Sequence, residues 1–168
     1  MKRLAIALMG FFLLSGLGCR PRSKEITSLQ RKEAASLASE AEFAVTLRDL
    51  PRAQGLLIKV TSLCPDNGEY WSNLGSVRMR LGDRDGAKNA YETALAAYKN
   101  TAKLEPQHTE LILQQVYVLA LLGRVEEARK LLEKAHQKFP EDRLVREFVQ
   151  EKTLDRLITE PTFKEISL

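Results

Sequence analysis

Two histidines, a pair of adjacent glutamates and a cysteine within an apolar run are the side chains of this 168-residue chain whose types suit catalysis or metal binding. His108 and His136 are far apart in sequence, and neither has a carboxylate or thiol at the spacing of a metal-ligand set. Glu126 and Glu127 begin a predicted helix, where acidic side chains favour the helix dipole. Cys64 ends an apolar run, which is typical of a small buried side chain, with a thiol-dependent activity as the alternative. We therefore expect no enzyme activity, no metal site and no cofactor.

The charge balance gives no sign of a nucleic acid partner. The chain has 26 Lys and Arg against 22 Asp and Glu, a net charge of +4, and two of these basic residues, Lys2 and Arg3, lie at its start. A phosphate-binding face normally shows a concentrated basic excess, which is missing here. Residues 82–86 (GDRDG) are interpreted as a turn between helices and not as a phosphate-binding loop. We expect no binding to nucleic acid.

Residues 1–18 have the layout of a secretory signal peptide. Lys2 and Arg3 give a basic start, residues 4–14 (LAIALMGFFLL) are apolar, and small residues follow up to Cys19. The uncharged run is shorter than the ~20 residues that a helix needs to cross a bilayer. The sequence therefore predicts a segment that is cleaved and does not span the membrane.

The junction of Gly18 and Cys19 resembles the lipobox of bacterial lipoproteins, in which the cysteine is acylated and becomes the new N-terminus. It departs from that family at Gly16, where the usual Leu is shifted to Leu17. The resemblance implies a lipid anchor on Cys19 and a place in the bacterial cell envelope, facing the periplasm or the exterior. Arg20, in the position of the Asp that is linked to inner-membrane retention, favours the outer membrane. Ordinary export, an uncleaved anchor and a cytoplasmic protein with an apolar start are the alternatives.

After residues 19–33, interpreted as the lipidated cysteine and a basic tether, the sequence has helical periodicity and repeats itself. Ala53, Ala87 and Ala128 are separated by 34 and then 41 residues. The same spacings separate Leu57, Tyr91 and Leu132, and also Val60, Ala94 and Ala135. These three series of positions agree with a period of 34 residues if seven extra residues lie between Ala94 and Pro106. Internal repetition with such a period predicts stacked supersecondary units.

A 34-residue unit of two helices is the tetratricopeptide repeat, and the second copy resembles that family residue by residue. Residues 71–75 read WSNLG, which matches the W-x-x-L-G motif, and Gly82, Ala87 and Tyr91 follow at the expected intervals. The third copy keeps fewer of these residues, and the first copy is the weakest. The resemblance implies an all-α fold, an α-α superhelix of three helix pairs, with a C-terminal helix that caps the open end.

The second copy contains the seven extra residues, which include neither Gly nor Pro. Seven residues are about two helical turns, so we expect its second helix to be lengthened, from near Arg84 to Leu104, unless Asn100 and Thr101 break it. The predicted units are repeat 1 over residues 34–67, repeat 2 over 68–108, repeat 3 over 109–142, a capping helix over 143–158 and a loose tail over 159–168.

The family resemblance implies a concave groove that is lined by the first helix of each pair. The groove residues assigned in this way are Glu42, Asn73, Met79, Arg80, Leu113, Gln114, Tyr117 and Leu121. Leu113, Tyr117 and Leu121 form an apolar stripe at four-residue spacing. Two interpretations of the stripe stay open. It is either a hydrophobic anchor for a partner segment, with Tyr117 at its centre, or a surface that neighbouring helices cover.

Some tetratricopeptide proteins grip a terminal carboxylate of their partner with two Lys, an Arg and two Asn. The matching positions here are Ala38, Glu42, Asn73, Glu110 and Gln114, of which only Asn73 fits, so this mode is disfavoured. The resemblances together predict a membrane-anchored adaptor or assembly factor that binds another, unidentified protein. The alternatives are a self-associating structural module of the envelope, and a soluble scaffold if the leader is not processed.

Overall fold

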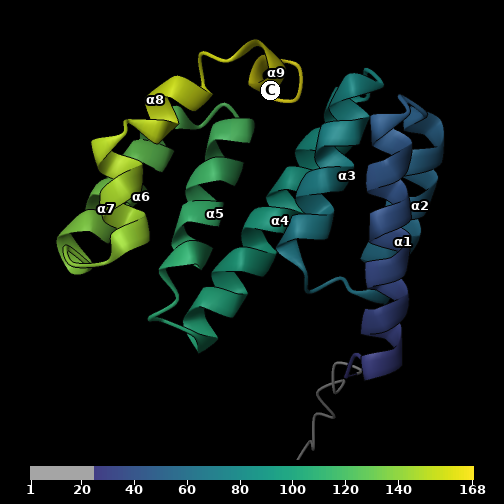
Figure 1. Ribbon diagram of the computed structural model, residues 1–168, viewed down its shortest axis with the longest axis horizontal. Coiled ribbons are helices and arrows are strands. Elements are labelled where there is room, and N and C mark those ends of the chain that lie inside the picture. The colour runs from purple at the N-terminus through teal and green to yellow at the C-terminus, as the bar shows by residue number, and fades with distance from the viewer. Residues whose placement is uncertain (1–24) are drawn as a thin grey trace, which may run out of the picture.

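The computed structural model describes residues 25–168. Within that range the chain forms nine helices and no strand (Figure 1). The all-α superhelix that the repeats predict is therefore confirmed. The predicted signal peptide and the predicted lipidation site, Cys19, lie outside the described residues. No helix within residues 25–168 combines the length and hydrophobicity needed to cross a membrane.

Six helices form three consecutive pairs. In chain order they are α1 (Ser28–Thr46) with α2 (Leu50–Leu63), α3 (Gly68–Arg80) with α4 (Arg84–Leu104), and α5 (Thr109–Leu121) with α6 (Val125–Lys138). The two helices of each pair pack together, and each pair packs on the next through α2 against α3 and α4 against α5. Figure 1 shows α1, α3 and α5 following one another across the molecule.

The turns inside the pairs are built from residues that suit them. Gly82 and Gly123 follow the first helices of pairs two and three with φ of 83° and 69°, a conformation that glycine adopts without strain. Arg48 takes the equivalent place in the first pair, also with positive φ (59°). Asp49 and Asp83 then cap the second helices, since their carboxylates accept hydrogen bonds from backbone N–H groups of the first turn.

Helix α4 is the longest of the six, with 21 residues against 14 in α2 and α6. It runs over Arg84–Leu104, the bounds that the seven-residue insertion predicts. The helix continues through Thr101, whose hydroxyl donates a 3.2 Å hydrogen bond to the backbone carbonyl of Ala97. The insertion thus adds helical turns at the C-terminal end of α4 and leaves its packing face in register.

Small residues allow the paired helices to approach closely. Ala53, Ala87 and Ala128, which occupy equivalent positions in the three repeats, are all fully buried. Gly75 on α3 faces the ring of Tyr91 on α4 so closely that a Cβ atom at position 75 would overlap the ring. Tyr91 is itself fully buried in the largest cluster of apolar side chains, which joins α3, α4, α5 and the C-terminal residues.

The C-terminal part departs from the predicted capping helix and loose tail. Two helices, α7 (Arg143–Gln150) and α8 (Thr153–Leu157), replace the single helix, and Lys152 between them has a φ of 49°. The predicted tail contains α9 (Pro161–Lys164), and the side chains of Phe163 and Ile166 are buried. In Figure 1 this segment returns from α8 to the space between α5 and α3. It is ordered because its apolar side chains complete the cluster around Tyr91.

Candidate functional site

The first helices of the three pairs bring four of the eight predicted groove residues into one hollow of about 410 Å³. Glu42 comes from α1, Asn73 and Arg80 from α3, and Tyr117 from α5. Three helices that are far apart in sequence therefore present both charges, an amide and a phenol to the same space. Side chains of these types can hydrogen-bond and pair with the backbone and the side chains of a peptide.

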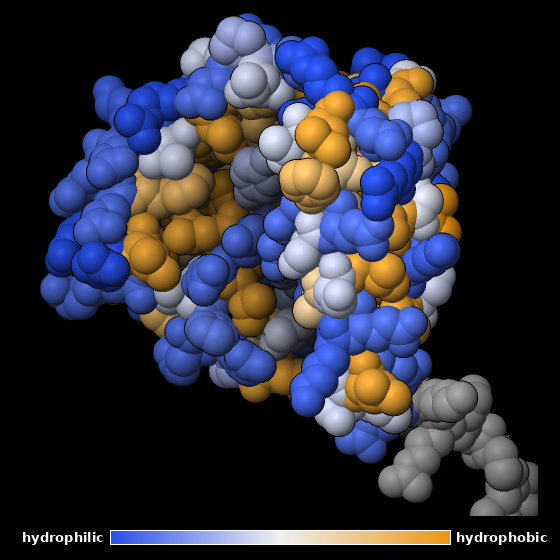
Figure 2. Space-filling model, turned by 45° about the vertical axis from the view of Figure 1, so that its right-hand side comes forward, coloured by the Kyte–Doolittle hydropathy of each residue, from blue (hydrophilic) through white to orange (hydrophobic). Residues whose placement is uncertain are grey.

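Apolar and hydroxyl side chains complete the walls of this hollow. They are Ala41, Val45, Leu57, Ser76, Val77 and Ile166, together with the carboxylate of Glu69. The space-filling view shows a recessed face with hydrophobic residues exposed in the recess between hydrophilic flanks (Figure 2). An apolar surface with a few convergent polar groups is typical of a binding site for a ligand or a peptide segment.

Arg80 is the cationic side chain of the hollow. It forms no ion pair with any other residue of the range 25–168. Burial raises the pKa of the neighbouring Tyr117, and the positive charge of Arg80 opposes this rise. The Tyr117 hydroxyl is therefore neutral at physiological pH, while the guanidinium of Arg80 is available to an acidic group of a partner.

Met79 and Leu121 differ from the prediction that they line the groove. Leu121 is fully buried and Met79 is 9% exposed, and both belong to the cluster around Tyr91. Met79 borders a second hollow, of about 590 Å³, beside Arg80. The physical reason is that the C-terminal segment packs over this end of α3 and α5 and covers both side chains. For Leu121, the structure agrees with the alternative interpretation of the stripe as covered packing.

The other three predicted groove residues on α5 have different surroundings. Leu113 is half-buried. Gln114 lines a separate hollow of about 370 Å³, which it shares with Arg31 and Asp66. Tyr117 is half-buried and meets the ring of Phe163 edge-on, with 5.8 Å between ring centroids and an interplanar angle of 72°. The three residues of the stripe thus differ: Leu113 is half-buried, Tyr117 lines the hollow, and Leu121 lies in the core.

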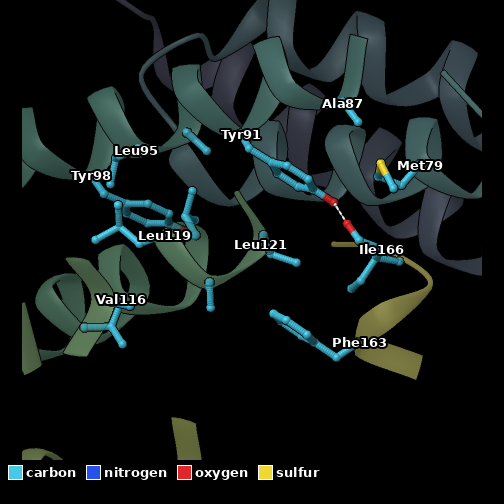
Figure 3. Packing of buried hydrophobic residues seen from close by; sticks show 14 of the residues in the cluster. Met79, Ala87, Tyr91, Leu95, Tyr98, Val116, Leu119, Leu121, Phe163 and Ile166 are labelled. Atoms are coloured by element: carbon cyan, nitrogen blue, oxygen red, sulfur yellow. Dashed lines mark hydrogen bonds between the residues drawn. The ribbon is translucent and has the colours of Figure 1, made fainter. Parts of the chain in front are cut away.

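Three residues of the C-terminal segment, which the sequence argument assigns to a loose tail, contribute to the site. The Tyr91 hydroxyl donates a 2.5 Å hydrogen bond to the backbone carbonyl of Ile166, as Figure 3 shows. The backbone N–H of Leu168 donates a 2.8 Å hydrogen bond to the carbonyl of Leu121. Phe163 points toward the same cluster from α9 (Figure 3). The only signal in the sequence is the apolar spacing of positions 163, 166 and 168, which covers a single turn.

The side chains whose types suit catalysis or metal binding do not come together in the structure. The Nδ1 atom of His108 lies 2.6 Å from a carboxylate oxygen of Glu105, three residues earlier, and both side chains are exposed. No group of three His, Cys, Asp or Glu side chains within residues 25–168 is arranged to hold a metal ion. Cys64 is 1% exposed, and burial raises the pKa of its thiol. A protonated, inaccessible thiol is a poor nucleophile.

These features define a short α-α superhelix with a hollow on the face of its first helices. Two sequence profiles of one family, described as tetratricopeptide repeat, match residues 68–101 and 87–151. The chain is also 37% identical over 76 residues to a protein of Schizosaccharomyces pombe named heat shock protein sti1 homolog. That match covers 45% of this chain and 12% of the relative, so the chain spans a small part of the relative's length.

The chain is therefore a tetratricopeptide repeat protein, and the profiles place the repeats within residues 68–151. Residues 34–67, the predicted first repeat, precede both matches, and the structure builds them into the helix pair α1 and α2. Tetratricopeptide repeats are protein–protein interaction modules.

Proposed function

We propose that this protein is a membrane-anchored adaptor or assembly factor that binds another protein through the hollow lined by Glu42, Asn73, Arg80 and Tyr117. The observation that carries the proposal is the convergence of these side chains from α1, α3 and α5 on one space. A partner segment that enters the hollow contacts all three repeats at once. Such a contact depends on the stacking of the repeats, which makes the folded solenoid the binding unit.

The lipid anchor on Cys19 rests on the basic start, the apolar run and the small residues of positions 1–18. We place the protein in the bacterial cell envelope, facing the periplasm or the exterior, with Arg20 favouring the outer membrane. In Figure 1, α1 begins at the end of the molecule opposite to α9.

An intact-mass and fractionation comparison of the wild type with Cys19→Ala, expressed with the leader in a bacterium, tests the anchor. We expect the wild type to lose residues 1–18, to gain the mass of acyl chains and to enter the membrane fraction, and the variant to do none of these. An unprocessed, soluble wild type that behaves like the variant would refute the anchor and direct the search for partners to the cytoplasm.

Photo-cross-linking tests the groove. A photoreactive amino acid at Asn73 is expected to give a discrete adduct in cells, and Arg80→Glu in the same chain is expected to remove it, because the substitution reverses the charge in the hollow. The matched control places the same amino acid at Lys88, an exposed position on α4. Equal adducts from both positions, or none from Asn73, would contradict the proposed use of the groove.

Self-association is the second candidate function, and one surface feature favours it. Phe43 and Leu47 are each 60% exposed and lie one turn apart at the end of α1, the outermost helix of the first pair. Sedimentation of the wild type and of Phe43→Ser/Leu47→Ser over a hundredfold range of concentration separates the candidates. A dimer that the substitutions dissociate would support self-association, and a monomer at all concentrations would reject it.

A further inference from the structure

Residues 161–168 are attached to the groove in the way that a peptide ligand is attached to its receptor. Of the side chains in this segment, Phe163 and Ile166 are buried, at 4% and 9% exposure, while Pro161, Lys164 and Glu165 are exposed. Phe163 lies in α9, and Ile166 follows its end in a turn in which the N–H of Ile166 donates a 3.1 Å hydrogen bond to the carbonyl of Phe163, so both side chains reach the same cluster. The half-buried Leu168 packs against the same cluster, so the segment contributes a small apolar face.

The two hydrogen bonds that hold the segment in the groove involve its backbone groups and not its side chains. Tyr91 donates to the carbonyl of Ile166, and the N–H of Leu168 donates to the carbonyl of Leu121. Leu121 is the last residue of α5, where carbonyl groups lack partners within the helix. The groove thus offers one donor and one acceptor that any polypeptide of suitable shape can use. The side chains at positions 163 and 166 supply the specificity.

The segment also borders the open parts of the groove. Ile166 forms one wall of the hollow that contains Asn73 and Tyr117. Thr162 and Glu165 form one wall of the second hollow, beside Arg80. A partner that extends along the first helices toward the end of α5 meets this segment. Its own backbone then competes for Tyr91 and for the carbonyl of Leu121.

Resting on the proposed function, we propose that residues 161–168 are an internal ligand of the concave groove, which a partner displaces. The partner class that fits is a protein segment with an aromatic residue followed three positions later by an aliphatic one, as Phe163 and Ile166 are. The entropic cost of ordering these residues is offset by the burial of Phe163 and Ile166, the partial burial of Leu168 and two hydrogen bonds to the segment's backbone. These contributions are few, so the closed state is favoured by a small margin. Because the segment occupies the groove, a partner binds with a lower apparent affinity than it would to the open groove.

Fluorescence anisotropy with a peptide of residues 159–168 tests this proposal. The peptide is amidated so that its terminal carboxylate contributes nothing, and it is titrated into the full chain as wild type and as Phe163→Ala/Ile166→Ala. Because the variant weakens the internal copy, we expect it to bind the peptide about tenfold more tightly than the wild type does. The matched control, Lys164→Ala/Glu165→Ala, changes exposed residues of the same turn and is expected to bind like the wild type.

Equal affinity of wild type and variant, or no binding to either, would overturn the proposal. If circular dichroism shows that the variant does not fold, hydrogen exchange of the wild type decides. The amide of Leu168 is expected to exchange through a local opening, faster than the amides of Val116 to Leu119 in α5. Equal protection of both would overturn the proposal. A wild-type dimer that the variant dissociates would show that a second copy supplies the segment, and would overturn the internal assignment.

The cross-linking experiment separates this inference from the proposed function. Equal adducts at Asn73 in the wild type and in Phe163→Ala/Ile166→Ala would leave the adaptor function in place and refute the competition. Tight binding of the peptide without any adduct in cells would support the internal ligand and refute the adaptor function.

Discussion

The hydroxyl of Tyr91 donates a 2.5 Å hydrogen bond to the backbone carbonyl of Ile166, 75 residues later in the chain. The ring of the same side chain lies against Gly75 of α3. One buried phenol on α4 therefore fixes the spacing of the second helix pair and also holds the C-terminal segment in place. Fold and groove occupancy are coupled at this residue.

Tyr91→Phe removes the hydroxyl and keeps the ring. The carbonyl of Ile166 then loses its donor, so we expect the free energy of unfolding to fall by about 1–2 kcal/mol at pH 7, measured by urea denaturation. Tyr70→Phe is the matched control, because the half-buried Tyr70 has no hydroxyl hydrogen bond within residues 25–168, and a change within about 0.5 kcal/mol is expected. Equal losses in both variants would contradict the role of the Tyr91 bond.

The pH dependence of Tyr91→Phe gives a second test of the same side chain. Burial raises the pKa of Tyr91 from 10.0 to about 12. Below pH 10 the hydroxyl is protonated in both the folded and the unfolded chain, so its contribution is complete. Between pH 10 and about 12 the unfolded chain alone loses the proton, and the wild type loses stability. The stability difference between wild type and Tyr91→Phe should therefore shrink over this interval, and a constant difference would show that Tyr91 is not buried.

Gly75→Ala tests the close approach of α3 and α4. A Cβ atom at this position overlaps the buried ring of Tyr91, so the substitution is expected to cost about 1–3 kcal/mol, measured as the free energy of unfolding. Gly55→Ala is the matched control, since Gly55 lies inside α2 with no atom near the new methyl group. There the expected change is a gain of about 0.5–1 kcal/mol from helix propensity. A neutral Gly75→Ala would mean that the helices separate without cost.

The register of α3 follows from the sequence, and that of α5 does not. The WSNLG motif of residues 71–75 determines which face of α3 packs inside, and Asn73 and Arg80 accordingly reach the hollow. Helix α5 lacks this motif and is apolar on nearly every side, so its pattern does not separate a packing face from an exposed one. The sequence assigns both Leu121 of α5 and Met79 of α3 to the groove, and the C-terminal segment, whose position the sequence does not predict, buries both of them.

The C-terminal region shows a second limit of local patterns. Residues 143–158 have continuous helical periodicity without Gly or Pro. The helix is nevertheless interrupted at Lys152, which has a positive φ. The last ten residues contain one short turn with two buried apolar side chains, too little for a periodic signal. Their position depends on Tyr91 and Leu121, which are distant in sequence. A pairing of this kind is visible only in three dimensions.

The thiol of Cys64 is expected to react slowly in the folded chain. It is 1% exposed, and burial raises its pKa, so few thiolates are available and reagent enters only through local opening. We expect alkylation at pH 8, followed by peptide mass spectrometry, to be about a hundredfold slower than in urea. Ser62→Cys, at an exposed position of α2, is the matched control and should react at similar rates in both conditions. Fast alkylation of Cys64 in the folded chain would contradict this expectation and support the alternative of a thiol-dependent activity.

Asp142 links the third repeat to the C-terminal helices. The stability that its carboxylate contributes should decrease measurably in acid. One carboxylate oxygen accepts a 3.0 Å hydrogen bond from the N–H of Val145 at the start of α7. The other accepts a 2.9 Å hydrogen bond from the hydroxyl of Thr109 at the start of α5. The hydrogen bond from Val145 is the main cause that lowers the pKa of Asp142 below its ordinary value, and Thr109 adds to it. The carboxylate therefore stabilises the folded chain above the pKa that it has when unfolded.

This contribution is lost as the pH falls through the lowered pKa of the folded state. Asp142→Ala is expected to lower the thermal midpoint at pH 7, and the deficit relative to the wild type should narrow between pH 4 and pH 2 as the wild type loses the same contribution. Asp142→Asn is the matched control, because its amide oxygen still caps α7 but does not titrate. It should fall between the other two at pH 7. A deficit of Asp142→Ala that is constant down to pH 2 would show that the charge of Asp142 does not stabilise the start of α7, and that the variant acts only through lost packing.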